Sequence, residues 1–226
     1  MNKSIVILGA SQGIGAALVD HFAQLEDTTV IALSRNLAKM RGRFLQKNVS
    51  CHQLDISQDV HQQIAALGFA SPIDILINNA GLLVNKPFPA LTHQDFTESY
   101  QVNVIGIMEA TQALLPQLAA DAHIVNISSM GGFQGSLKFA GLAAYSTSKA
   151  ALCAFTELFA EEYKATSLRM NCLCLGAVQT EMLSAAFPGY IAPTSPAEMA
   201  QFIADFALNN GSFFNGKIIP VSSSNP

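Results

Sequence analysis

The sequence contains few charged residues, no tryptophan and no run of basic residues. Only 12% of its 226 residues are charged, 50% are hydrophobic, and the formal net charge at pH 7 is −4. A nucleic-acid interface needs clustered Lys and Arg side chains to neutralise phosphates, so nucleic acid has little support as a partner. The same composition predicts a large hydrophobic core and an apolar surface that a partner subunit covers.

Long hydrophobic runs are also absent. No stretch approaches the roughly 20 apolar residues of a transmembrane helix, so we expect no membrane span and no membrane partner. The apolar stretch Ile5–Leu8 is too short for a signal peptide and leads directly into glycines. We expect it to be the first β-strand of a cytoplasmic protein.

Cysteine is scarce, with no disulfide-framework spacing among Cys51, Cys153, Cys172 and Cys174. Cys172 and Cys174 would lie on one face of a strand with their Cβ atoms about 7 Å apart, whereas a disulfide needs about 4 Å. We therefore expect buried free thiols in a reducing cytosol. The five histidines are scattered and no His/Cys/Asp cluster has metal-ligand spacing, so no metal site is expected.

Short apolar segments alternate along the chain with segments of helical periodicity, without repeats or a low-complexity linker. The expected strands are Ser4–Leu8, Thr29–Leu33, Val49–Leu54, Ile73–Ile77, His123–Ile127, Met170–Leu175 and Ile218–Val221. The expected helices are Ile14–Leu25, Gln94–Tyr100, Val104–Leu118, Ala143–Lys164 and Pro196–Leu208. This alternation predicts an α/β fold with a mostly parallel sheet covered by helices on both faces. The loop-like segments Val84–Pro89 and Phe187–Pro196 are expected to border a pocket.

A glycine pattern, G-x-x-x-G-x-G, follows the first expected strand at Gly9, Gly13 and Gly15. A glycine-rich turn between a strand and a helix can hold a pyrophosphate against backbone N–H groups and the helix N-terminus. The same pattern also serves as a tight turn that binds nothing, so taken alone it leaves both interpretations open.

Tyr145 and Lys149 are four residues apart, which places a phenol and an ammonium on one face of a helix. A neighbouring cation favours phenolate over phenol, so the tyrosine exchanges a proton more readily near neutral pH. Taken singly, each also fits an ordinary role, as a core tyrosine and a solvated helix lysine.

With five motifs in order, the sequence resembles the short-chain dehydrogenase/reductase family over nearly its whole length. The matching segments are Gly9 to Gly15, Asn78 to Gly81, Gln101 to Gly106, Asn126 to Gly132 and Tyr145 to Lys149. The resemblance implies a single Rossmann domain over residues 1–226, a doubly wound sheet of about seven strands, and a substrate loop around 181–195. It also implies an enzyme that oxidises CH–OH or reduces C=O groups with NAD(P).

The resemblance implies four catalytic residues. Tyr145 would be the general acid in reduction, and Lys149 would favour its phenolate and bind the ribose hydroxyls. Ser129 would donate a hydrogen bond to the substrate oxygen, and Asn103 would anchor a water that links Lys149 to solvent. Two alternatives stay open: Ser128 competes with Ser129, because neighbouring strand residues face opposite sides, and Asn103 also fits a helix N-cap.

The end of the second strand bears on the choice between NADP and NAD. An NAD enzyme usually has a carboxylate there, whereas this chain has Ser34 and then Arg35, which can pair with a 2′-phosphate. Arg41 and Arg43 are further candidates, and the alternative is that Arg35 is only a solvated loop residue. We expect NADP (NADPH), with NAD as the alternative. The expected cofactor-binding residues are Gly9, Ser11, Gln12, Gly13, Ile14, Gly15, Ser34, Arg35, Asp55, Asn79, Ala80, Gly81, Tyr145, Lys149, Gly176, Val178 and Thr180, with Asp55 near the adenine by resemblance.

Three segments depart from the family pattern. Leu175 stands where the family commonly has proline before Gly176, the tail from Ile219 lacks the usual Asp-Gly-Gly, and extra residues follow Ser129, including Ser136–Phe139. The first departure concerns the shape of the loop in which the Val178 backbone and Thr180 would hold the nicotinamide carboxamide. The second puts the usual C-terminal subunit contact in doubt, and the third would reshape the pocket. The expected pocket residues are Leu82, Met130, Phe133, Phe139, Met182 and Phe187.

The expected function is an NADPH-dependent carbonyl reductase or secondary alcohol dehydrogenase acting on a small apolar molecule. One alternative is a non-catalytic nucleotide-sensing or signalling protein of the same fold, although such members usually lose Tyr or Lys. Another is a 3-oxoacyl-carrier-protein reductase, which needs basic residues near the site's mouth, and Leu114–Asp121 has none. The apolar helices Val104–Leu118 and Ala143–Lys164 imply, by resemblance, a homodimer or homotetramer.

Overall fold

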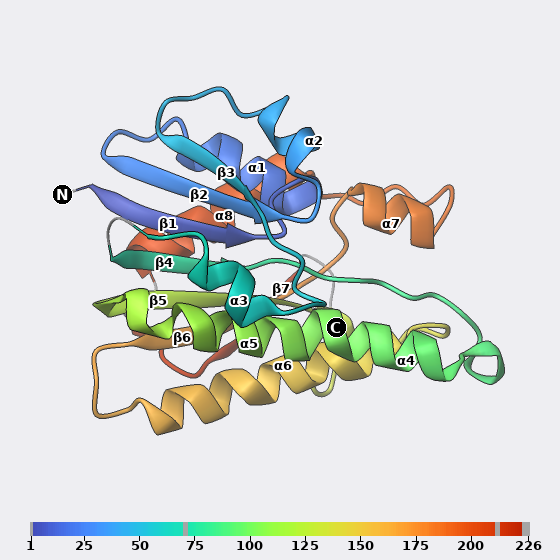
Figure 1. The fold of residues 1–226 in the computed structure, drawn as a ribbon. Helices are drawn as coiled ribbons and strands as arrows, with labels where there is room; N and C mark the ends of the chain where they lie inside the picture. Colours follow the sequence, from blue (N-terminus) through green and yellow to red (C-terminus); the bar gives the residue numbers. More distant parts are fainter. Residues whose placement is uncertain (1, 70–71, 211–212, 223–226) are drawn as a thin grey trace.

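A single parallel β-sheet of seven strands organises the chain (Figure 1). The computed structural model describes residues 2–69, 72–210 and 213–222. The strand order is β3-β2-β1-β4-β5-β6-β7. The bounds are β1 (Lys3–Leu8), β2 (Thr28–Ser34), β3 (Val49–Gln53), β4 (Ile73–Asn78), β5 (Leu118–Ser129), β6 (Arg169–Leu175) and β7 (Ile218–Val221). The predicted Rossmann-type parallel sheet is confirmed.

Helices cover both faces of the sheet. Residues of β1 alternate between the two sides: Ile5 and Ile7 pack in the core under α1 and α8, whereas Val6 and Leu8 pack in the core under α3, α5 and α6. The bounds are α1 (Gly13–Phe22), α2 (Leu37–Arg41), α3 (Val60–Ala65), α4 (His93–Tyr100), α5 (Gly106–Leu114), α6 (Ala143–Glu162), α7 (Glu181–Ala186) and α8 (Pro196–Asp205). Among the helices of the described residues, none combines the length and apolarity needed to cross a membrane.

The helix predicted over Val104–Leu118 is shorter at both ends. A π-helical turn, Gln101–Ile105, joins α4 to α5, and α5 ends at Leu114. Pro116 lies in the following 3-10 turn, Leu115–Gln117, where its missing N–H and its ring prevent the helix from continuing. Strand β5 then begins at Leu118, five residues earlier than predicted.

The carboxyl ends of the strands form the functional edge of the sheet. The chain proceeds from β1 outward to β3, then returns to pair β4 with the other side of β1. This reversal leaves a crevice at the carboxyl ends of β1 and β4, the place where doubly wound folds bind ligands. Helix α7 stands beyond this edge, at the right of the view in Figure 1.

Candidate active site

A cleft of about 720 Å³ opens at the carboxyl edge of the sheet. Its size is within the usual range for small-molecule sites. Segments that are distant in sequence line it: the glycine turn after β1, the ends of β2, β4 and β5, the first turns of α6, and the loop after β6. Of the predicted site residues, those lining the cleft are Gly9, Ser11, Gln12, Gly13, Ile14, Ser34, Arg35, Asp55, Asn79, Ala80, Gly81, Ser129, Tyr145, Lys149, Gly176, Val178 and Thr180.

Two of the predicted site residues, Gly15 and Asn103, lie next to this lining. A Cβ on Gly15 would stand 2.9 Å from the carbonyl carbon of Gly9. A Cβ on Gly81 would stand 3.4 Å from Oδ1 of Asn103. Both therefore pack directly behind residues that face the cleft.

The glycine turn is shaped to approach a ligand closely. Gly9 has φ +80°, and a Cβ there would stand 2.6 Å from the Cα of Ala80, so only glycine fits. Asn79 holds the turn in place, because its Nδ2 donates to the carbonyl of Gly9 at 3.0 Å. Within the described part of the chain, Gln12 caps α1 without a side-chain hydrogen bond, which leaves first-turn N–H groups for a phosphate. These features fit the pyrophosphate of a dinucleotide.

The end of β2 carries positive charge, as expected. The hydroxyl of Ser34 donates to that of Ser11 at 2.9 Å, and the exposed Arg35 follows it. A shallow hollow beside the cleft is lined by Arg35, Asn36, Leu37, Ala38, Arg41 and Gln53. Arg43 instead forms an ion pair with Asp20 of α1.

The sequence analysis missed a further cation at this end of the cleft. The Nζ of Lys39 donates to Oε1 of Gln12 at 3.0 Å. Its position four residues after Arg35 was the available signal. After β3, Oδ1 of Asp55 accepts from the backbone N and the hydroxyl of Ser57, at 2.9 and 2.6 Å, which fixes the carboxylate.

Tyr145 and Lys149 lie on the first two turns of α6, facing the cleft. Lys149 is buried, and its Nζ donates to the carbonyl of Ile127 in β5 at 2.8 Å. Burial lowers the pKa of Lys149 from its ordinary 10.5 to about 8. Burial raises the pKa of Tyr145, and the Ser129 side chain partly opposes that rise. This direction is opposite to the one expected from the Tyr-x-x-x-Lys spacing, because the loss of hydration on burial is the largest influence on the phenol. The cleft is therefore lined by both the phenol of Tyr145 and the amine of Lys149, whose pKa is about 8.

The geometry distinguishes Ser129 from Ser128. Ser129 lines the cleft together with Tyr145 and counters the rise in the pKa of that phenol, and its Oγ accepts from the N–H of Gly131 at 3.2 Å. The hydroxyl of Ser128 donates to the carbonyl of Lys149 at 2.9 Å, under α6. Of the two, Ser129 has the position for a substrate oxygen beside Tyr145.

The comparisons with known proteins agree with this geometry. A family model described as short chain dehydrogenase matches residues 3–190. The ketoacyl reductase HetN of Nostoc sp. (strain PCC 7120) is 31% identical over 191 residues, 80% of this chain and 65% of that protein. The 3-oxoacyl-[acyl-carrier-protein] reductase FabG of Aquifex aeolicus is 27% identical over 247 residues, 97% of this chain and 96% of that protein. The crystal structure of BdcA in complex with NADPH has a TM-score of 0.85, with 24% identity over 99% of this chain and 94% of that one.

The chain belongs to the short-chain dehydrogenase family. It is therefore an oxidoreductase that acts on CH–OH or C=O groups with a nicotinamide nucleotide. Members of this family act on small-molecule substrates, as the sequence predicted for this chain.

In this short-chain dehydrogenase, Asn103 lies within the π-helical turn between α4 and α5. It is therefore not a helix N-cap, which was the alternative raised from the sequence. Its Nδ2 donates to the carbonyl of Leu82 and to the hydroxyl of Ser148, both at 2.9 Å, and its Oδ1 accepts from the N–H of Leu82 at 2.7 Å. The hydroxyl of Ser148 in turn donates to the carbonyl of Tyr145 at 2.7 Å. Asn103 thus connects the loop after β4 to the turn of α6 that carries the phenol.

The loop after β6 covers the glycine turn. A Cβ on Gly176 would stand 2.6 Å from the hydroxyl of Ser222. Thr180 is the N-cap of α7, its Oγ1 accepting from the N–H of Leu183 at 3.2 Å. A Cβ on Gly13 would stand 3.2 Å from Cγ2 of Thr180. The missing proline before Gly176 therefore does not prevent this loop from reaching the cofactor end of the cleft.

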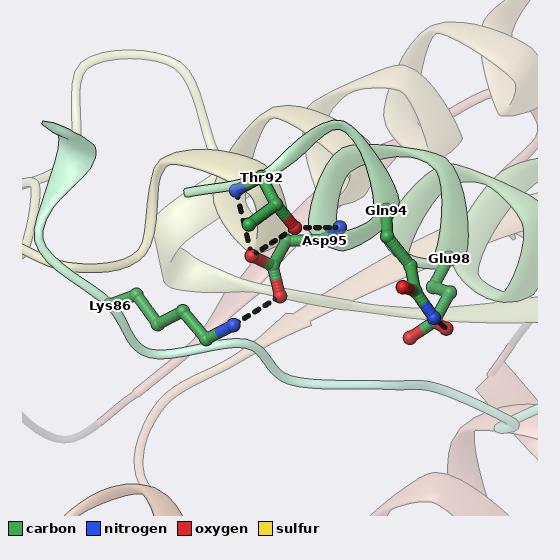
Figure 2. Close-up of polar contacts among 5 residues, drawn as sticks. All are labelled: Lys86, Thr92, Gln94, Asp95 and Glu98. Carbon is green, nitrogen blue, oxygen red and sulfur yellow. Dashed lines mark hydrogen bonds and ion pairs between the residues drawn. The ribbon is translucent and has the colours of Figure 1, made fainter. Parts of the chain in front are cut away.

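Hydrogen bonds around Asp95 hold the loop between β4 and α4 in place. Figure 2 shows the Thr92 hydroxyl accepting from the N–H of Asp95, while the Asp95 carboxylate accepts from the N–H and hydroxyl of Thr92. The Nζ of Lys86 joins the same carboxylate at 2.6 Å. The hydrogen bond from Lys86, ahead of those from Thr92, lowers the pKa of Asp95 to about 2. Asn85 of this loop donates to the carbonyl of Ala186 at 2.8 Å, so the loop after β4 contacts the end of α7.

The apolar half of the cleft differs in part from the predicted pocket. Met130, Phe139, Met182 and Phe187 line it, as predicted. Leu82 and Phe133 do not line it: the backbone of Leu82 is bound to the Asn103 side chain, and Phe133 packs in the core beside Met130. Further apolar residues that line it are Leu83, Leu137, Leu142, Leu183 and Tyr190.

Three of the four cysteines meet beneath this site. The Sγ of Cys153 in α6 lies 3.9 Å from that of Cys172 and 3.6 Å from that of Cys174, both in β6. All three are buried free thiols, as predicted. Their convergence was not predicted, because residue spacing cannot show which helix crosses which strand.

Proposed function

We propose that this dehydrogenase is an NADPH-dependent carbonyl reductase, or the corresponding secondary alcohol dehydrogenase, for a small apolar substrate. The observation that carries the proposal is that Ser129, Tyr145 and Lys149 meet in the same cleft as the glycine turn. The apolar lining supports the substrate class. A substrate loop around residues 181–195 is part of the proposal, since Met182, Phe187 and Tyr190 face the cleft from that segment.

When bound, the nicotinamide nucleotide supplies or accepts the hydride. Tyr145 gives its phenolic proton to the carbonyl oxygen in reduction, and takes it back in oxidation. Ser129 donates a hydrogen bond to the same oxygen, and this bond strengthens as negative charge develops there. Lys149, whose Nζ donates to the carbonyl of Ile127, would stabilise the phenolate of Tyr145 by its charge and would bind the ribose hydroxyls of the nucleotide.

We propose Asn103 as a positioning residue. Its side chain is engaged by Leu82 and Ser148, so it fixes α6 relative to the loop after β4. The second lone pair of its Oδ1 is the place where its side chain would hold a water near Lys149.

The decisive test of the mechanism is Tyr145→Phe. Removing the general acid should lower turnover by about 10²–10⁴-fold, with cofactor affinity nearly unchanged. Tyr163→Phe is the matched control, because it removes the same hydroxyl at the far end of α6, where Tyr163 stacks on Phe159. A Tyr145→Phe enzyme that keeps more than about a third of wild-type turnover in a chemistry-limited assay would refute the mechanism.

The test of the cofactor preference is Arg35→Ala. A charge-assisted hydrogen bond to the 2′-phosphate contributes roughly 1.5–3 kcal/mol, so the variant should bind NADPH about ten- to a hundredfold more weakly. Its affinity for NADH should change little, and added salt should weaken NADPH more than NADH. Arg43→Ala, which removes the same charge but breaks the ion pair with Asp20, should leave both affinities near wild type. Equal losses for NADPH and NADH in Arg35→Ala would remove the basis for the preference.

A 3-oxoacyl-carrier-protein reductase is the second candidate, favoured by the names of the two relatives. The sequence argument against it was wrong, because it placed Leu114–Asp121 at the mouth of the site. That segment leads into the amino end of β5, whereas Ser129 and the cleft lie at the carboxyl end. A panel of small ketones, 3-oxoacyl thioesters and the carrier-bound 3-oxoacyl group, each with NADPH and NADH, separates the two candidates.

The same panel tests the non-catalytic alternative. A nucleotide sensor would bind NADPH without turning over any carbonyl substrate. The presence of Ser129, Tyr145 and Lys149 in one cleft supports catalytic turnover. As a separate proposal, we place the enzyme in the cytoplasm.

We also propose that the protein is a homodimer or homotetramer assembled through α5 and α6. Several apolar side chains on and beside these helices are exposed: Ile105, Met108 and, at 69%, Leu158. Light scattering that shows a monomer at micromolar concentration would reject this assembly.

A further inference from the structure

The three buried thiols of Cys153, Cys172 and Cys174 take no part in the proposed reaction. Their exposed fractions are 8%, 0% and 0%, and their sulfur atoms all lie within 4.8 Å of one another. Two of them share one face of β6, because residues two apart on a strand point the same way. Cys153 faces them from α6, one turn after Lys149.

The hydroxyl of Ser128 completes the group. It lies on β5, directly paired with Cys174 of β6, and its oxygen is 3.5 Å from the Sγ of Cys153. Its proton is donated to the carbonyl of Lys149 at 2.9 Å. The lone pairs of the hydroxyl oxygen therefore remain for a partner on the side of the thiols.

The separations around Cys153 match edges of a metal coordination tetrahedron. Zinc–sulfur bonds of about 2.3 Å give sulfur–sulfur edges of about 3.8 Å, and a zinc–oxygen bond of about 2.0 Å gives a sulfur–oxygen edge of about 3.5 Å. The three edges that meet at Cys153 agree: its Sγ lies 3.9 Å from that of Cys172, 3.6 Å from that of Cys174 and 3.5 Å from the Ser128 oxygen. The third pair of sulfurs lies within 4.8 Å. We propose that Cys153, Cys172 and Cys174, with the Ser128 hydroxyl, bind one thiophilic divalent cation of the zinc class.

The surroundings suit such a site. Met130, Phe133 and Ile218 pack around the thiols and keep bulk water out. Three thiolates and a divalent cation leave one net negative charge, which the positive charge of Lys149 opposes through its interaction with Cys153. Ser128 and Met130 also line the cleft, which provides an entry path for the ion.

The test is a titration of the fully reduced protein with Zn²⁺ against a chelating indicator. Wild type should bind one ion per chain, and Cd²⁺ should give an ultraviolet thiolate-to-metal absorption band. Cys174→Ala and Cys153→Ala should each weaken Zn²⁺ by more than about a hundredfold, since even loss of an outer-shell partner costs 10–100-fold. Cys51→Ala is the matched control, because Cys51 lies in β3 away from the cluster, and it should bind as wild type does.

Thermal unfolding supplies the second measurement. An ion that binds only the folded chain raises the midpoint temperature, so Zn²⁺ should raise it for wild type and for Cys51→Ala but not for the two cluster variants. The ion-free unfolding transition of each variant shows that it folds. Ser128→Ala should keep the cadmium band, because all three thiolates remain, and should weaken Zn²⁺ by at least the roughly 10–100-fold that loss of an outer-shell partner costs.

Three results would overturn the proposal. The first is no stoichiometric Zn²⁺ binding by wild type. The second is equal binding by wild type and both cluster variants, which would show an adventitious ion only. The third is rapid closure of a Cys153–Cys174 disulfide under mild oxidation in the presence of excess Zn²⁺, which would make the cluster a thiol pair rather than a metal site.

Discussion

Replacing Gly15 by alanine tests the packing of α1 against the glycine turn. A Cβ at this position would overlap the carbonyl oxygen of Gly9, stand 2.9 Å from its carbonyl carbon, and reach Nδ2 of Asn79 at 2.5 Å. Two of these obstacles belong to the backbone, so they cannot move aside as a side chain would. Overpacking of this kind costs about 1–3 kcal/mol, and we take the upper end because the obstacle is backbone.

Alanine also favours the helix, and this opposes the clash. Ala is better than Gly in a helix interior by about 1 kcal/mol, so the net loss for Gly15→Ala is about 2 kcal/mol. In a chain of this length, 1 kcal/mol shifts the unfolding midpoint by about 2–4 °C. The midpoint should therefore fall by roughly 4–8 °C. NADPH should also bind more weakly, because the displaced carbonyl of Gly9 is the partner of Asn79.

The measurement is thermal unfolding followed by far-ultraviolet circular dichroism, since the chain has no tryptophan to report by fluorescence. Gly42→Ala is the matched control. Gly42 has φ −76° and ψ −16°, and a Cβ there would stand 3.5 Å from the carbonyl oxygen of Ala38, an ordinary contact. That variant should gain about 0.4–1 kcal/mol. A Gly15→Ala protein as stable as wild type would show that α1 does not need glycine for close approach.

Two further predictions concern Lys149 and Thr92. A pKa of about 8 against an ordinary 10.5 corresponds to about 3 kcal/mol for holding the ammonium of Lys149 in the interior. Lys149→Met, which also loses the bond to Ile127 at about 1 kcal/mol, should stabilise the inactive protein by about 2 kcal/mol. The gain in unfolding free energy should be full below pH 8 and shrink as pH rises to 10.5, because folded wild type then loses the Lys149 proton while the unfolded chain keeps it. Denaturant unfolding at pH 7 and pH 10 measures the gain, and an equal gain at both pH values would contradict the prediction. Thr92→Ala removes the N-cap of α4 and should cost about 0.5–2 kcal/mol, whereas Thr92→Ser should keep the cap bond to Asp95 and lose little; equal melting points for the two variants would show that the cap contributes nothing.

The parts of the fold set by nearby residues were predictable from the sequence. The strand, glycine turn and helix around Gly9 follow from an apolar run, glycine punctuation and helical periodicity. The shared face of Tyr145 and Lys149 follows from helix geometry alone. All seven strands were located within a few residues, the largest error being the start of β5. That error had a visible signal in Pro116, which ends a helix.

Other parts depend on contacts between distant segments. Helices α2, α3 and α7 have five or six residues each, too few to show periodicity. The two neighbouring serines can be told apart only once the packing of α6 against β5 is known. The Ser128 hydroxyl then donates to the carbonyl of Lys149, whereas Ser129 acts on the pKa of Tyr145. Predicting the cysteine cluster likewise requires knowing that α6, which carries Cys153, packs on β6, which carries Cys172 and Cys174. Residue spacing within a segment cannot supply such relations.

Lys149 connects the stability of the fold to its chemistry. A buried amine destabilises the folded chain. Two hydrogen bonds nevertheless hold Lys149 in place: its backbone carbonyl accepts from the Ser128 hydroxyl, and its Nζ donates to the carbonyl of Ile127. An ammonium with a pKa of about 8 remains mostly charged at neutral pH, which it must be to stabilise a phenolate. Further burial would neutralise the amine, and greater exposure would let water screen its charge. Lys149 lies on α6 between Tyr145 and Cys153. In the proposed mechanism, a change in charge at the thiol cluster should therefore also change the pKa of the amine that assists Tyr145.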